Sequence, residues 1–370
     1  MNIKAGLVGL PNVGKSTLFN ALTKAGVPAE NYPFCTIDPH VAITHVPDER
    51  LEKLTALYKS KKIVSADMMF VDIAGLVKGA SQGEGLGNQF LSHIREVNLI
   101  IHVLRCFENP NIVHTSSTID PLSDLEIIQQ ELMLKDVESI QKRLEKIESL
   151  AKAAQQKPAE KKQLEAEREL LNRIFNAINN FDTTAIKSIL DTTTVQTVPL
   201  LSTKNFIIVA NLDEEHVSQQ QRQENKHYQE LIKKFGTSRV IPLCVKLEQE
   251  LSELPQEQAQ QLMDELNMHE SGLTHIISTS YRELGMITFF TCGPQETHAW
   301  PIPKGITIRQ AAGEIHSDFE RGFICAEVYN YTDVIALGSE QKVKESGRAR
   351  TEGSGDIVQD GDIVLIKFNI

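Results

Sequence analysis

The sequence lacks the features that mark three classes of protein. Its 370 residues contain no run of the roughly eighteen apolar residues that a membrane-spanning helix needs. The N-terminus has no basic region followed by an apolar stretch and a small-residue cleavage site, so we expect no secretory signal. The five cysteines are scattered and include no Cys-x-x-Cys pair, which argues against a disulfide framework or a zinc site. These absences predict a cytoplasmic protein, because thiols stay reduced there.

Basic residues are fewer than acidic ones. The chain has 38 Lys and Arg against 49 Asp and Glu, a net charge of −11. This acidic surplus argues against a general nucleic-acid-binding protein and against DNA specificity. Any contact with RNA would have to come from a local basic patch. The length and a hydrophobic content of 41% predict about two or three domains with packed cores.

The first twenty residues hold the most informative motif. An apolar stretch at 3–9 predicts a strand, and the spacing of Leu18, Leu22 and Ala25 predicts a following helix. Between them lies Gly-Leu-Pro-Asn-Val-Gly-Lys-Ser at 9–16, which fits the phosphate-binding pattern of Gly, four free positions, Gly, Lys and Ser or Thr. A plain glycine turn is the alternative, but strand, loop and helix together are the context that a phosphate-binding loop requires.

Each residue type in this loop has a chemical reason. Gly9 and Gly14 let the backbone curl without a Cβ, so that amide groups and the helix N-terminus can point at an anion. Lys15 would supply positive charge for the terminal phosphates, and the Ser16 hydroxyl would bind Mg²⁺. The loop therefore predicts a nucleoside triphosphate bound with magnesium.

Two further segments fit the same site. A proline-bracketed loop at 31–39 carries Thr36, in the place where P-loop switch proteins close a threonine on magnesium and the γ-phosphate; an ordinary loop threonine is the alternative. The apolar strand at 68–72 ends in Asp72, and Gly75 follows three residues later. Asp72 would hold magnesium through water, and the Gly75 amide would reach the γ-phosphate.

The segments that would promote hydrolysis depart from the ordinary pattern. Small GTPases carry a water-positioning glutamine after this glycine, whereas this chain has Leu76, which cannot orient water. The glycine-rich segment at 79–87 suits a switch that orders when nucleotide binds, or a plain linker. His114 lies in a polar loop at 109–120, and from position alone a surface role and a catalytic role both stay open.

Residues 124–181 change to a helical repeat. Over 133–154, apolar residues recur in alternating steps of four and three, the spacing of a coiled-coil seam. Pro158 should interrupt the helix, and a second apolar series at 164–178 should form the returning helix. The expected tip at 152–162 has four lysines against one glutamate, which suits either an RNA contact or a solvated helix end.

The strand at 206–210 leads into a segment that resembles a base-recognition motif, Asn211-Leu212-Asp213-Glu214. GTPases have Asn-Lys-x-Asp here, in which the aspartate accepts from two guanine donors and the lysine stem covers the base. Leu212 in place of lysine and Glu214 in place of aspartate should disturb the guanine contacts. The change favours adenine, with a tolerant pocket that takes GTP as the alternative.

From about Thr279 the pattern is one of short strands and turns. We expect strands at 286–291, 326–329 and 363–368 and one helix at 308–319. No catalytic constellation is visible in this part of the sequence, which predicts a small α+β binding module.

Four segments together resemble one family. They are Gly-Leu-Pro-Asn-Val-Gly-Lys-Ser at 9–16, Asn-Tyr-Pro-Phe-Cys-Thr-Ile at 31–37, Asp-Ile-Ala-Gly-Leu-Val-Lys-Gly-Ala at 72–80 and Val-Gln-Asp-Gly-Asp-Ile at 358–363. Over essentially its whole length the chain resembles the YchF, or Obg-like ATPase, family. This family is related to Obg and belongs to the translation-factor (TRAFAC) group of P-loop proteins.

The resemblance implies an α/β fold with additions. A P-loop nucleoside triphosphatase domain of the Obg type would cover residues 1–122 and 200–278, with an α-helical coiled-coil hairpin inserted at 123–199. A C-terminal TGS domain, an α+β fold with a ubiquitin-like β-grasp sheet, would cover 279–370.

The resemblance also implies site residues. Lys15 and His114 would be catalytic, the histidine by serving the hydrolytic water, in keeping with a hydrophobic Leu76. The magnesium ligands would be Ser16 and Thr36, together with Asp72. The nucleotide would contact Asn12, Val13, Gly14, Lys15, Ser16, Thr17, Asn211, Leu212 and Glu214. An asparagine at position 12 goes with potassium activation in related P-loop proteins, so K⁺ is a second candidate cofactor.

The implied activity is magnesium-dependent hydrolysis of ATP in preference to GTP, as a regulatory switch that associates with ribosomes. We expect the large subunit as the partner, with a local, salt-sensitive contact to rRNA, and no membrane partner. Two alternatives stay open. One is a GTP-hydrolysing assembly factor, and the other is a ribosome-binding adaptor that is gated by nucleotide and turns over little of it.

Overall fold

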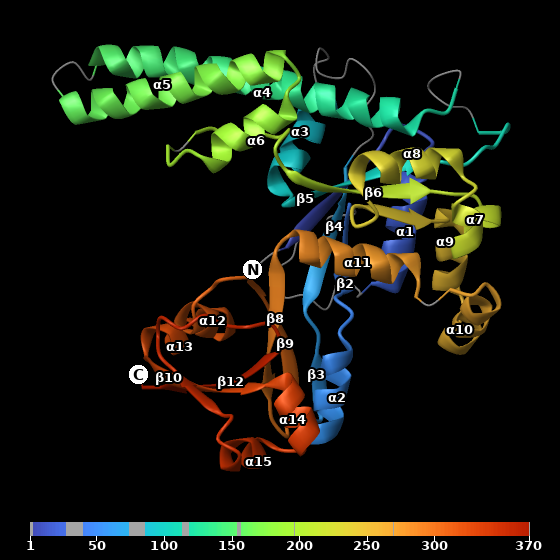
Figure 1. Cartoon of the computed structure of the whole chain (residues 1–370), viewed down its shortest axis with the longest axis vertical. Coiled ribbons are helices and arrows are strands. Elements are labelled where there is room, and N and C mark those ends of the chain that lie inside the picture. Colours follow the sequence, from blue (N-terminus) through green and yellow to red (C-terminus); the bar gives the residue numbers. More distant parts are fainter. Residues whose placement is uncertain are drawn as a thin grey trace. The chain divides into compact units, whose positions relative to one another are not determined.

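Figure 1 shows the computed structural model of the chain, which describes residues 3–26, 40–73, 86–112, 118–153, 157–195, 197–268 and 270–369. The chain divides into two compact units. Unit 1 comprises Met1–Ala5, Ser16–Val71 and Ile241–Ile370, and unit 2 comprises Gly6–Lys15 and Asp72–Val240. In the described part of the chain, no helix combines the length and the apolar character that crossing a bilayer requires.

The first sheet has six strands in the order β2-β4-β1-β5-β6-β7. Their bounds are β1 Lys4–Val8, β2 Val41–His45, β4 Asp67–Asp72, β5 Leu99–Arg105, β6 Asn205–Asn211 and β7 Val240–Leu243. The sheet is mixed, because β2 runs antiparallel to β4 whereas β5 runs parallel to β6. All of β5 is buried, as expected for a parallel strand of almost wholly apolar sequence. The strands expected at 3–9, 68–72 and 206–210 are confirmed.

The helices of unit 2 follow the strands or form the hairpin. Their bounds are α3 Leu86–Glu96, α4 Pro121–Ala153, α5 Pro158–Asn179, α6 Thr183–Asp191, α7 Gln219–Arg222 and α8 Lys226–Phe235, with a 3₁₀ helix η3 at Glu214–His216. Pro158 is the first residue of α5, where its missing N–H costs nothing. The break predicted at this proline is therefore confirmed.

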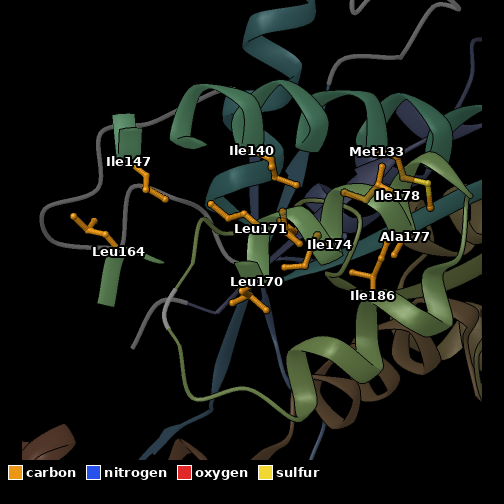
Figure 2. Packing of buried hydrophobic residues seen from close by; sticks show 11 residues of the cluster. Met133, Ile140, Ile147, Leu164, Leu170, Leu171, Ile174, Ala177, Ile178 and Ile186 are labelled. Atoms are coloured by element: carbon orange, nitrogen blue, oxygen red, sulfur yellow. The ribbon is translucent and has the colours of Figure 1, made fainter. Parts of the chain in front are cut away.

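The apolar repeat of α4 and α5 forms a buried seam, which Figure 2 shows from close by. The buried residues of this cluster, which also takes in Ile186 of α6 and Leu200, are Met133, Ile140, Ile147, Leu164, Leu170, Leu171, Ile174, Ala177, Ile178, Ile186 and Leu200. An ion pair also joins the two helices, since Nε and Nη2 of Arg143 each donate to the carboxylate of Glu167 at 2.7 Å. The spacing therefore predicted most of the buried hairpin positions, whereas Leu170 and Ala177 were not predicted.

Unit 1 carries the remaining helices. Their bounds are α1 Lys15–Ala25, which begins at the last residue of a unit 2 segment, α2 Glu49–Tyr58, α9 Val245–Glu253, α10 Gln256–Glu265, α11 Gly272–Glu283, α12 Ile308–Ile315, α13 Ser317–Arg321, α14 Tyr331–Leu337 and α15 Glu340–Glu345. The helix expected at 308–319 is confirmed only as far as Ile315, because a second helix begins at Ser317. His316 is extended (φ −162°, ψ 140°) and its imidazole accepts from the Asp318 amide, so a new helix begins after it.

The second sheet, in unit 1, has the order β11-β10-β12-β8-β9-β3. The bounds are β3 Lys62–Val64, β8 Met286–Cys292, β9 Glu296–Pro303, β10 Phe323–Asn330, β11 Arg350–Glu352 and β12 Asp362–Phe368. Antiparallel pairing joins β8 to β9 and β10 to both β11 and β12, whereas β12 pairs parallel with β8. β3, one of the two edge strands, comes from the first fifth of the chain and runs parallel to β9.

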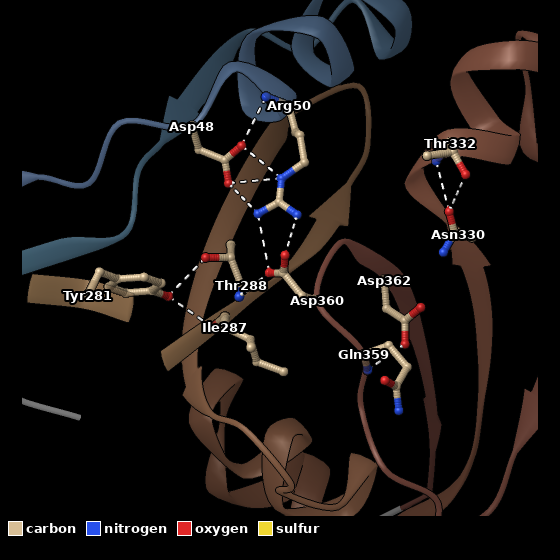
Figure 3. Close-up of polar contacts among 10 residues, drawn as sticks. All are labelled: Asp48, Arg50, Tyr281, Ile287, Thr288, Asn330, Thr332, Gln359, Asp360 and Asp362. Atoms are coloured by element: carbon tan, nitrogen blue, oxygen red, sulfur yellow. Dashed lines mark hydrogen bonds and ion pairs between the residues drawn. The ribbon is translucent and has the colours of Figure 1, made fainter. Parts of the chain in front are cut away.

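An arginine of α2 contacts the turn that leads into β12 of this second sheet (Figure 3). Arg50 donates from Nη2 to Asp48 and from Nη1 to Asp360, both at 2.8 Å. Asp360 in turn accepts from the Thr288 amide at 2.9 Å, and the Gly361 amide donates to the Thr288 carbonyl at 2.8 Å. The motif at 358–363 is therefore a turn that connects β8 and β12 to α2. The domain boundaries expected from the sequence stay a prediction.

Candidate phosphate-binding site

In unit 2, the candidate site comprises the loop after β1, as far as Lys15, and Asp72. The phosphate-binding loop at 9–16 follows β1 directly, and Asp72 is the last residue of β4. The Ile73 amide donates to the Leu7 carbonyl at 3.2 Å, so the two strand ends lie side by side. Ligands of open α/β sheets bind at the carboxyl ends of strands, where loops can converge.

The loop has the strained backbone that a phosphate cradle needs. Asn12 has φ +65° and Gly14 has φ +98°, a region that asparagine tolerates and glycine enters freely. Gly9 serves a different purpose. A Cβ at that position would lie 2.7 Å from the Val103 carbonyl oxygen of β5. Gly9 thus allows close packing against β5, whereas Gly14 permits the turn.

Lys15 and Asp72 form the charged centre of the site. The Lys15 ammonium contacts the Asp72 carboxylate directly, and the two side chains are only 10% and 17% exposed. The lysine and the aspartate belong to different motifs and are 57 positions apart in the sequence. The structure therefore brings together the cation expected for the terminal phosphates and the carboxylate expected for magnesium.

Asn211 ties the base-recognition segment to the phosphate-binding loop. Its side-chain amide donates to the Val13 carbonyl at 2.9 Å, and the residue is buried. Leu212 is also buried, within an apolar cluster that includes Leu104 and Leu231. Glu214 begins η3 and is exposed. Contacts between these residues and a nucleotide base stay a prediction.

The other predicted site residues fall into two groups. Ser16 and Thr17 lie in the first turn of α1, directly after Lys15. Thr36 and His114 lie outside the described residues, as do Gly75, Leu76 and the segment at 79–85. Their roles therefore remain as the sequence predicted them.

The donors at the site suit magnesium. Mg²⁺ prefers hard oxygen ligands and is usually held by one or two carboxylates or hydroxyls together with phosphates and water. The Asp72 carboxylate already lies against a cation in a site with little exposure, and the Ser16 hydroxyl follows Lys15 in the chain. Ser16, Asp72 and, by sequence, Thr36 are the side chains that could hold the ion.

A buried arginine, which belongs to no recognised motif, lies beside this site. Arg105 ends β5 and is 2% exposed, and its partner in the register with β6 is Asn211. Burial lowers the pKa of Arg105, while the buried carboxylate of Asp124 acts in the opposite direction. The available signal was an arginine that directly follows a run of core residues, where a charge needs a partner.

Comparison with known proteins agrees with this fold. Residues 4–159 match a family model described as 50S ribosome-binding GTPase. Residues 286–369 match the model of the YchF GTPase C-terminal region, whose own description is a protein of unknown function. The chain thus has a P-loop GTPase-type α/β fold with an additional C-terminal region.

Full-length relatives identify the family. The chain is 45% identical over 372 residues to "Ribosome-binding ATPase YchF" of Bacillus subtilis (strain 168), and both chains are covered completely. It is 44% identical over 375 residues to "Obg-like ATPase 1" of Oryza sativa subsp. japonica, with 100% of this chain and 93% of that protein covered. The solved structure of the Schizosaccharomyces pombe YchF GTPase matches with a TM-score of 0.84 at 37% identity, covering 99% of this chain and 98% of that one. The chain therefore belongs to the YchF family of Obg-like P-loop nucleoside triphosphatases.

Proposed function

We propose that this chain is a magnesium-dependent ATPase that acts as a ribosome-associated switch in the cytoplasm. The observation that carries the proposal is the contact between Lys15 and Asp72 beside the strained loop at 9–16. Relatives named ribosome-binding ATPase share more than 40% of their sequence with this chain over its full length. Their activity is the most direct guide to its substrate and partner.

The proposed roles follow from charge and geometry. Backbone amides of residues 12–17 would bind the phosphate oxygens, and Lys15 would exchange part of its contact with Asp72 for the terminal phosphates. Ser16, Thr36 and Asp72 would hold magnesium. When bound, this ion would neutralise the charge that develops on the phosphates. A K⁺ ion beside Asn12 would help to neutralise that charge.

The proposed preference for ATP rests on the segment after β6. The side chain of Leu212 packs in the core, so it offers no cationic stem to cover a guanine ring. Glu214 is longer than the aspartate that normally receives the two guanine donors. Both substitutions remove guanine contacts without removing the phosphate contacts, on which every nucleoside triphosphate depends.

The proposed hydrolysis step uses His114. Leu76 replaces the usual glutamine and cannot bind water, so a different group must orient the nucleophile. Histidine is suited to that role because it can accept a proton near neutral pH. Replacement of His114 by alanine should lower turnover while leaving ATP affinity within about twofold; unchanged turnover would remove the histidine from the mechanism.

The remaining parts are proposed as reporters of the nucleotide state. Residues 123–199 would be a coiled-coil insertion and residues 279–370 a TGS domain. Together they would contact the large ribosomal subunit, with the lysines at 152–162 near rRNA. Because such a contact would be electrostatic, ribosome association should weaken as salt rises.

The first test is a calorimetric titration with ATP and with GTP, both with magnesium. ATP should bind at least about tenfold more tightly, a difference of about 1.4 kcal/mol. The Lys15→Ala variant should lose measurable binding of both. Tighter binding of GTP would instead support the GTP-hydrolysing assembly factor. No turnover of either nucleotide, with or without ribosomes, would support the adaptor.

A further inference from the structure

Arg105 is a buried cation that the proposed chemistry does not use. Each of its three guanidinium nitrogens donates to a backbone carbonyl of the loop that follows β5. Nε donates to Phe107 at 3.2 Å, Nη1 to Ile112 at 3.0 Å and Nη2 to Asn109 at 3.1 Å. The guanidinium carbon also lies 4.7 Å from the centre of the Phe107 ring. One side chain thus holds both ends and the middle of the described loop at 107–112.

The same loop is closed by its own backbone. The Asn109 side chain accepts from the Asn111 amide at 2.9 Å, and the Ile112 amide donates to the Asn109 carbonyl at 3.2 Å. These two bonds form a compact turn around Asn109. The turn presents three carbonyl groups to a single planar cation, a geometry that suits the fixed fork of arginine.

The anchored loop starts next to the candidate site. The Cys106 amide donates to the Asn211 carbonyl at 2.9 Å. The side chain of Asn211 donates in turn to Val13 of the phosphate-binding loop. Two hydrogen bonds therefore connect the start of the Arg105 loop to the backbone that would carry the phosphates. A displacement of the Arg105 side chain would therefore also displace backbone next to the phosphate-binding loop.

We propose that Arg105 is a positioning residue for hydrolysis, and the proposal rests on the function proposed above. At 2% exposure Arg105 cannot reach a nucleotide. It sets the conformation of residues 107–112, which lead in the sequence to the segment that carries His114. Arg105 should therefore govern the rate of hydrolysis and leave the affinity for nucleotide unchanged.

The test compares Arg105→Lys with the same substitution at Arg143. Lysine keeps the charge but cannot donate along three fixed directions. Arg143 makes a two-pronged ion pair with Glu167 within the hairpin, so Arg143→Lys controls for the loss of a bidentate arginine contact. The readouts for each full-length variant are ATP turnover, the Kd for ADP and hydrogen exchange of peptides that cover 106–112.

In Arg105→Lys, turnover should fall about tenfold or more while the Kd for ADP stays within about twofold. Amide exchange should rise in the 106–112 peptides and not in the hairpin. Arg143→Lys should retain normal turnover. Unchanged turnover in Arg105→Lys would overturn the proposal, as would a parallel loss of ADP affinity, which would indicate a purely structural role.

A milder variant covers the case in which Arg105→Lys does not fold. Asn109→Ala removes only the bond to the Asn111 amide, at a partly exposed position. Severalfold lower turnover with unchanged ADP affinity supports the proposal, and normal turnover overturns it. Failure of the proposed function is seen separately, because the unsubstituted chain would then show no ATP turnover.

Discussion

Lys15 and Arg105 are both cations of unit 2 with little exposure, and they differ in what they contact. Lys15 meets a carboxylate 57 positions away, whereas the Arg105 guanidinium meets carbonyls within seven positions. The compact ammonium of lysine can exchange one anion for another. A planar guanidinium that donates to three acceptors is held in one orientation. At the residue scale, a cation's geometry separates a binding role from a positioning role.

Glu327 of β10 allows a test by pH. Its carboxylate accepts from Lys344, Lys367 and the Tyr329 hydroxyl, and these bonds lower its pKa from 4.5 to about 2. A pKa lower in the folded than in the unfolded state stabilises the fold above pH 4.5, and that stability is lost as the pH falls toward 2. In urea titrations, the stability advantage over Glu327→Gln should therefore shrink between pH 5 and pH 2. A gap that does not change with pH would contradict this assignment.

At the scale of elements, a buried carboxylate of the hairpin binds the segment that precedes β6. Asp136 of α4 has no exposed surface, and its two oxygens accept from the amides of Leu201 and Ser202 at 2.7 and 2.8 Å. These amides lie just before β6, where the chain returns from the hairpin. Burial raises the pKa of Asp136, while these bonds act in the opposite direction. The carboxylate therefore connects two elements whose sequences show no relation to each other.

Asp136→Asn should destabilise the chain by about 2–4 kcal/mol, because its amide nitrogen would face a buried N–H. Glu138→Gln is the control, since Glu138 lies on the same helix and pairs with Lys135 where it is about half exposed. Glu138→Gln should lower the free energy of unfolding by at most about 1 kcal/mol. Denaturant unfolding of the two variants measures the difference. Equal losses would mean that the two amides find another acceptor.

At the scale of the whole molecule, the ion pair between Arg50 and Asp360 joins residues far apart in the sequence. They are 310 positions apart, and their pairing brings α2 of unit 1 to the turn that precedes β12. Gly361 is part of the same arrangement, because a Cβ there would lie 3.1 Å from the Arg50 Nη1 and its φ is +85°. The first and last quarters of the chain therefore share one polar cluster.

A double-mutant cycle of Arg50→Gln and Asp360→Asn should give a coupling free energy of about 1 kcal/mol. The value is discounted for solvent screening, because Asp360 is about half exposed. The control cycle uses Lys53 and Glu49 of the same helix, an ion pair that is mostly exposed. Its coupling should be indistinguishable from zero. Denaturation curves of all variants provide the measurement, and equal coupling in both cycles would contradict a special role for Arg50.

The sequence predicted elements whose pattern is local. The phosphate-binding loop, the β1, β4 and β6 strands and the hairpin seam were all visible in the spacing of neighbouring residues. The interruption at His316 was not visible, because it depends on the extended backbone of one residue whose side chain caps the next helix. β9 was also missed, since Pro301 and Pro303 lower the expectation of a strand although both are tolerated here.

The sequence alone therefore determined the loop chemistry, the apolar strands and the hairpin, because each depends on side chains a few positions apart. Only the tertiary structure decided that β3 pairs with β9, that Arg50 meets Asp360 and that Arg105 holds the loop after β5. The first two join residues that are hundreds of positions apart. The last depends on backbone carbonyls, which every residue carries and no sequence motif distinguishes.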